Sequence, residues 1–80
     1  MTIETIAKKT FDDGHTLRLT RVKKKTKVSF SLELENRHVI NIFPEDYLEE
    51  SKARDVYDSI QSKQEYKAKA EELGWRSPWL

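Results

Sequence analysis

The feature that most constrains the fold is the strict alternation of apolar and polar residues between Lys27 and Glu35. Successive side chains of a β-strand point to opposite faces, so this pattern is typical of a strand with one buried and one wet face. A helix would spread the same apolar residues around its axis. We therefore predict a strand whose buried side carries Val28, Phe30, Leu32 and Leu34.

The next apolar run, His38 to Phe43, carries apolar residues on both faces. In an extended chain Ile40 and Ile42 share one face, and Val39 and Phe43 share the other. Such a strand is typically covered on both sides, at least in part. A helix covers only one side of a sheet, so the other side is left for a C-terminal tail, a partner subunit or a ligand.

Two further strands are expected before this pair. Residues 2–11 are rich in β-branched and aromatic residues but alternate imperfectly, which indicates an irregular edge strand. Asp12-Asp13-Gly14 predicts a hairpin turn. In the second strand, His15 to Lys23, Val22 is out of phase with the leucines. Either a bulge near Arg21 or a Val22 that covers the opposite face would explain this.

After Pro44 the apolar period becomes helical. The first helix begins either near Asp46 or at a cap on Ser51. Ser62, with Glu65 three residues later, has the form of a capping box, which favours a kink or a second helix. The predicted fold is therefore α+β: a four-stranded antiparallel meander followed by one long or two short C-terminal helices packed on one sheet face (ββββα).

Composition predicts a single domain, residues 1–80, that ends in a short aromatic tail, residues 75–80. The chain has no cysteine, no signal-like segment and no apolar run of bilayer length, so we expect a cytoplasmic protein without a membrane contact. Residues 1–43 contain nine Lys or Arg against five Asp or Glu, whereas residues 44–80 contain six against nine. This asymmetry indicates a basic sheet and an acidic helical region.

The sequence carries no motif that is typical of an enzyme. His15 and His38 are the only histidines, and neither has a second ligand at metal-binding spacing. Two glycines provide no phosphate-binding loop, and no serine lies in a nucleophile elbow. We therefore expect no catalytic, cofactor-binding or metal-binding residue, and no small-molecule substrate.

Two kinds of binding site remain. The first is a protein-docking surface, because tryptophan is enriched among interface hot spots and the strand expected over residues 38–43, with apolar residues on both faces, needs cover. The alternative is a nucleic-acid site on the basic hairpin, since phosphate binding requires clustered cations rather than a precise motif. The expected protein-binding residues are Trp75, Trp79, Val39 and Phe43, and the alternative nucleic-acid-binding residues are Arg18, Arg21, Lys23, Lys24, Lys25, Lys27 and Arg37.

The primary hypothesis is thus a small non-enzymatic interaction module that docks to another protein or to itself as a homodimer. The order of four strands and a helix is similar to that of the single-strand-binding domains of transcriptional coactivators and PUR repeats. This is a likeness of element order, which transfers no residue and does not determine function.

Overall fold

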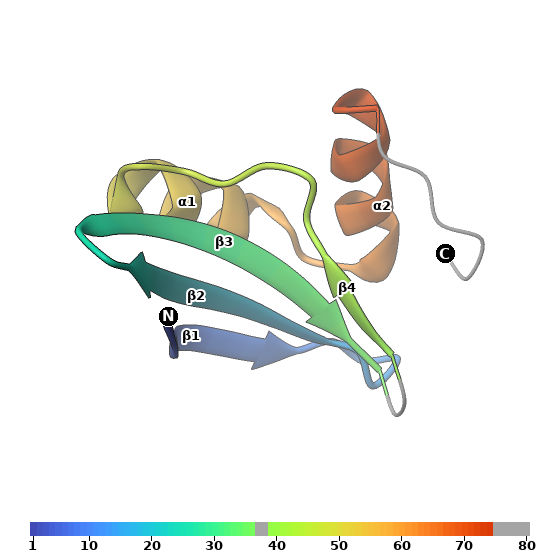
Figure 1. Cartoon of the computed structure of the whole chain (residues 1–80). Coiled ribbons are helices and arrows are strands. Elements are labelled where there is room, and N and C mark those ends of the chain that lie inside the picture. The colour runs from blue at the N-terminus through green and yellow to red at the C-terminus, as the bar shows by residue number, and fades with distance from the viewer. Residues whose placement is uncertain (37–38, 75–80) are drawn as a thin grey trace.

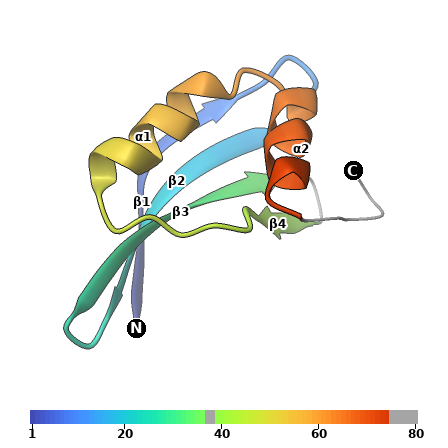
Figure 2. The same ribbon diagram turned by 90° about the horizontal axis from the view of Figure 1, so that it is seen from above.

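The computed structural model describes residues 1–36 and 39–74 and confirms the predicted α+β architecture (Figure 1). One antiparallel sheet has the order β1-β2-β3-β4. Its strands are β1 (Thr2–Thr10), β2 (Thr16–Lys24), β3 (Lys27–Glu35) and β4 (Ile40–Ile42), followed by helices α1 (Glu50–Ser59) and α2 (Lys63–Glu72). Both helices lie on the same side of the sheet, α1 over β2 and β3 and α2 over β4 (Figures 1 and 2).

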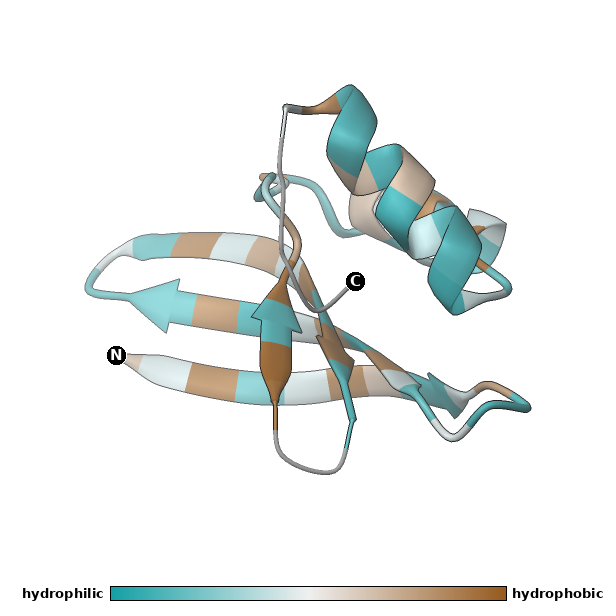
Figure 3. Cartoon of the chain, turned by 90° about the vertical axis from the view of Figure 1, so that its right-hand side faces the viewer, coloured by the Kyte–Doolittle hydropathy of each residue, from teal (hydrophilic) through white to brown (hydrophobic). Residues whose placement is uncertain are grey.

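The core lies between the sheet and the two helices. The predicted buried side of β3 is confirmed for Leu32 and Leu34, which are fully buried and pair across the sheet with the equally buried Leu19 and Leu17, whereas Val28 near the strand start is 39% exposed. The hydropathy colouring in Figure 3 shows the alternation of apolar and polar residues along the strands. Fully burying each such side chain stabilises a fold by about 1.5–3 kcal/mol. The helices complete the core with Ala53, Tyr57, Ile60, Tyr66 and Ala70.

The irregular first strand has a specific cause. The register between β1 and β2 shifts between Thr5 and Ala7, so Ile6 sits at a β-bulge. The pairing of β2 with β3 runs without a shift from Thr16 to Lys24. The predicted alternative of a bulge near Arg21 is therefore wrong, and Val22 faces the side opposite the leucines.

Two hairpin turns join the first three strands. At the first turn Gly14 has φ +92°, and Asp13 Oδ1 accepts a hydrogen bond from the backbone N–H of His15 at 3.0 Å. At the second turn, between the paired residues Lys24 and Lys27, Lys25 has φ +56°. Such a left-handed conformation is costly for a residue with a Cβ.

The chain after β4 continues along β3. The Phe43 N–H donates to Leu32 O at 2.9 Å, and Tyr47 exchanges two backbone hydrogen bonds of 2.7 Å with Phe30. Phe43 is 2% exposed and meets Tyr66 edge to face, with 5.3 Å between the ring centroids. The buried residues on the helix side are therefore Asn41 within β4 and Phe43 just after it, whereas Ile40 and Ile42 on the other face of β4 are exposed, contrary to the expected cover on both sides.

The helical region contains two helices rather than one. α1 begins at Glu50, between the two predicted starts, and its N-cap residue Glu49 makes no side-chain capping bond. The predicted Ser62 cap is confirmed, because Ser62 Oγ accepts a hydrogen bond from the Glu65 N–H at 3.2 Å at the start of α2. Gly74, with φ +86°, follows the end of α2. Neither helix has the length and apolar character that crossing a bilayer requires, in the part of the chain described.

Candidate interaction surfaces

The sheet has one face without a helix, which we call the open face. Strand register arranges its side chains in rows that cross the sheet. One row contains Lys8, Arg18, Glu33 and Ile42; the next contains Thr5, Thr20 and Ser31; a third contains Ile3, Val22 and Ser29. These rows define which residues of the open face are neighbours.

Two pairs of aliphatic side chains lie on the open face. Ile40 and Ile42, here called the β4 pair, are 55% and 62% exposed. Ile3 and Val22, the β1–β2 pair, are cross-strand partners at the other end of the face, and Ile3 is 55% exposed. Large apolar side chains exposed together on a regular strand are typical of a surface that another molecule covers.

The centre of the open face is polar and internally satisfied. Thr20 and Ser31 are cross-strand partners, and both are buried. Their hydroxyl oxygens lie 2.9 Å apart, and Thr20 Oγ1 also donates to Ser31 O at 3.2 Å. These hydroxyls are therefore already hydrogen-bonded, and their burial leaves little of them for a partner to contact.

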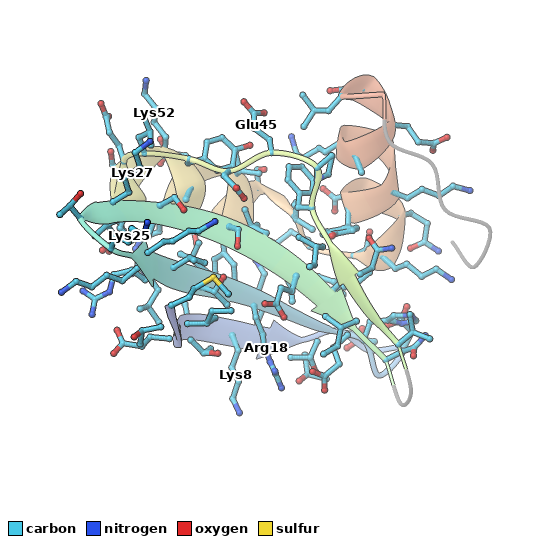
Figure 4. All side chains as sticks on the ribbon, in the orientation of Figure 1. Lys8, Arg18, Lys25, Lys27, Glu45 and Lys52 are labelled. Carbon is cyan, nitrogen blue, oxygen red and sulfur yellow. The ribbon has the colours of Figure 1, made fainter. Side chains whose placement is uncertain are left out.

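Charged side chains separate the two aliphatic pairs. Lys8 and Arg18 project from the sheet on the side away from the helices (Figure 4). Arg18 Nη1 lies 3.0 Å from Glu35 Oε2, so the guanidinium of Arg18 reaches from β2 toward β3. Thr5, Ile6, Ala7, Lys8 and Arg18 line a shallow hollow of about 500 Å³ beside the β1 bulge. Basic groups thus lie over β1 and β2, and acidic groups lie over β3.

The predicted protein-binding residues do not lie together on one surface. Phe43 is a core residue, so its assignment to a docking surface is wrong. The reason is that Asn41 and Phe43 share the helix side of β4, where Tyr66 contacts both. Val39 is 37% exposed. Trp75 and Trp79 lie outside the described residues.

The sequence reasoning missed the exposure of the β4 pair. It recognised that Ile40 and Ile42 share a face but did not identify this face as the open one. Asn41 did not indicate the buried face of β4, because a polar amide is usually expected on the exposed face of a strand. Phe43 was the available signal, since the bulkiest apolar residue of the run buries the most area.

The predicted nucleic-acid-binding residues do not form one continuous face. Arg18 lies on the open face, whereas Arg21 lies on the helix side and forms a 2.9 Å ion pair with Glu4. Lys25 and Lys27 lie at the β2–β3 end of the sheet (Figure 4). Lys23, Lys24, Lys25 and Lys27, the basic tip, are all exposed, and within the described chain none has an ion-pair partner. Arg37 lies outside the described residues.

A histidine–carboxylate contact is present at the first turn. His15 Nδ1 lies 3.0 Å from Asp13 Oδ1. The hydrogen bond from the His15 backbone N–H, with a smaller contribution from the imidazole, holds the pKa of Asp13 below its ordinary value of 3.8. This contact closes the turn around Gly14. The described residues contain no group of three His, Cys, Asp or Glu side chains arranged to hold a metal ion.

No protein-family model, curated protein or solved structure matches this chain.

Proposed function

We propose that this protein is a non-enzymatic interaction module that docks to another protein through the open face of its sheet. The observation that carries the proposal is the exposure of Ile40 and Ile42 on a strand whose other face is core. Burying both side chains in an interface would stabilise the complex by a few kcal/mol, at about 25 cal/mol per Å² of apolar area. The adjoining carboxylates, Glu33 and Glu35, favour a partner with an apolar surface that basic groups surround.

The proposal is tested by a photo-crosslinking amino acid placed at position 42 in cells that make the protein naturally. We expect a protein adduct from position 42. The matched control is position 48, because Leu48 is 83% exposed but lies outside the sheet, and it should give no such adduct. Equal adducts from both positions, or none from position 42, would overturn the proposal.

A second candidate function is nucleic-acid binding by the basic tip. It is favoured by four exposed lysines without ion-pair partners in the described chain. Two observations make it the weaker candidate. Alternate lysines point to opposite sides of the hairpin. Phe30 and Phe43 are buried, so the described strands offer no aromatic platform on which bases could stack.

Oligonucleotide binding tests the second candidate. Lys24→Glu combined with Lys25→Glu should abolish binding to a mixed single-stranded pool, and wild-type affinity should fall steeply with salt. Binding that tolerates both the substitutions and the salt would exclude the basic tip as a phosphate-binding site.

A further inference from the structure

We infer that the partner of the open face is a second copy of this chain, docked face to face about a two-fold axis. The inference rests on the proposed protein-docking function and identifies the partner. It follows from the positions of the two aliphatic pairs, which make the open face complementary to itself.

The strand register places the two pairs symmetrically about Ser31. Ile42 lies one strand beyond Ser31, in the row of Glu33. Val22 lies one strand before Ser31, in the row of Ser29, on the other side of the Ser31 row. Rows and strands are evenly spaced in a sheet, so Ser31 is midway between Ile42 and Val22.

A single two-fold axis therefore brings unlike pairs together. The axis lies between the two stacked faces, over Ser31, and is perpendicular to the line from Ile42 to Val22. It places Ile42 of one copy on Val22 of the second copy, and Ile40 close to Ile3. Symmetry repeats the contact, as in an isologous dimer. The strands of the two sheets then cross at a steep angle, which is an established way for sheets to pack.

The charges on the open face do not favour this arrangement. By the same register, Lys8 lies two strands before Ser31 in the row of Glu33, so the axis also passes over Lys8 and brings the Lys8 side chains of the two copies together. Salt screens such a repulsion, so dimerisation should strengthen as the ionic strength rises.

The available area indicates a weak dimer. Three strands of nine residues and the three-residue β4, with strands about 4.8 Å apart, give a face of roughly 500 Å², or about 1,000 Å² for both copies. This is near the lower limit for a specific interface, so we expect a concentration-dependent equilibrium rather than an obligate dimer.

The experiment is sedimentation equilibrium of the purified protein from micromolar to millimolar concentration. Wild type should dimerise reversibly, whereas Ile40→Asp and Ile3→Lys should each weaken dimerisation at least tenfold. A 1:1 mixture of the two variants should form a heterodimer. One of its two symmetry-related contacts is then the unchanged Ile40–Ile3 contact, and the other pairs the new Asp with the new Lys. Leu48→Asp is the matched control for an added exposed charge and should dimerise like wild type.

A second measurement needs no charged substitution. The chain has no cysteine, so Val22→Cys and Ile42→Cys variants each carry one thiol. Under mild oxidation the mixture should form a disulfide-linked dimer between the two variants, and neither variant alone should do so.

The outcomes separate the two proposals. A wild-type protein that stays monomeric throughout overturns the second-copy inference, as does a mixture that fails to associate or cross-link. If position 42 still cross-links to a different protein in cells, the docking function stands with another partner.

Discussion

Lys9 on β1 contacts Tyr57 on α1 in two ways. Its Nζ donates to the Tyr57 carbonyl oxygen at 2.9 Å and lies 4.5 Å from the centroid of the Tyr57 ring. α1 has no basic residue in its last turn, so Lys9 supplies from the sheet the cation that a helix C-terminus favours. The same residue combines a charge-assisted hydrogen bond with a cation–π contact.

We expect Lys9→Met, which keeps the aliphatic stem, to lower the free energy of unfolding by about 1.5–3 kcal/mol, since hydrogen bonds to charged groups contribute about this much. Urea denaturation measures the change. Lys8→Met is the matched control, because Lys8 projects from the opposite side of the sheet and is exposed, and it should change stability by less than about 0.5 kcal/mol. Equal effects of both substitutions would show that Lys9 acts only through its general charge.

The buried Tyr66 hydroxyl gives the second prediction. It donates to the backbone carbonyl oxygen of Asn41 at 3.1 Å and fastens α2 to β4. Burial raises the pKa of Tyr66 strongly, so the hydroxyl stays protonated as a donor. Tyr66→Phe should cost about 1–3 kcal/mol, because a buried acceptor loses its partner. Tyr47→Phe is the control, since the Tyr47 hydroxyl makes only a 3.5 Å contact with exposed Glu45. A destabilisation by Tyr47→Phe as large as that by Tyr66→Phe would contradict this account.

The basic tip offers a stabilising substitution. Lys25 holds φ +56°, a conformation that costs an L-residue about 1–2 kcal/mol and glycine much less. Lys25→Gly should therefore raise the free energy of unfolding by about 0.5–1 kcal/mol, after the greater freedom of glycine in the unfolded chain is offset. Lys24→Gly, one residue earlier within β2, should instead destabilise the protein. Thermal unfolding distinguishes the two signs, and a loss of stability in both variants would refute the argument.

The fold was predictable from the sequence at those elements whose structure is determined by residues close to each other in the chain. The alternation along β3, the Asp-Gly turn and the Ser62 cap are each governed by neighbouring residues. By contrast, which face of β4 is buried depends on α2, whose Tyr66 is 25 residues away from Asn41 and holds it to the core. No local period contains that information, so Phe43 was misassigned and the β4 pair was missed.

The β1 bulge was unpredictable for a related reason. It depends on which residues of β1 meet β2, and imperfect alternation between Thr2 and Phe11 is compatible with several registers. The division of the basic hairpin was predictable in principle, because Arg18 and Arg21 differ by an odd number of positions in one strand. Their carboxylate partners, Glu35 and Glu4, were not predictable, because they come from different neighbouring strands.

The contrast between the two helix starts gives a fourth prediction. Ser62 caps α2 through its hydroxyl, whereas Glu49 at the start of α1 makes no capping bond. Ser62→Ala should lower stability by about 1 kcal/mol, and Glu49→Ser should raise it by a similar or smaller amount. Ser51→Ala, inside the first turn of α1, should have little effect. Denaturant midpoints report all three, and an unchanged midpoint for Ser62→Ala would show that the capping bond contributes nothing.

The last prediction concerns acid stability at the first turn. The His15 backbone N–H lowers the pKa of Asp13 in the folded protein, so the charged carboxylate favours folding. This contribution is complete well above the ordinary pKa of 3.8 and is lost as the pH falls through the lower folded value. Asp13→Asn keeps a side-chain oxygen for the turn but removes the titration. The variant should therefore lose less stability than wild type between pH 5 and pH 2, measured by urea denaturation at each pH. NMR titration of the Asp13 carboxyl provides the direct check, and a folded pKa at or above 3.8 would contradict the assigned role of the His15 N–H.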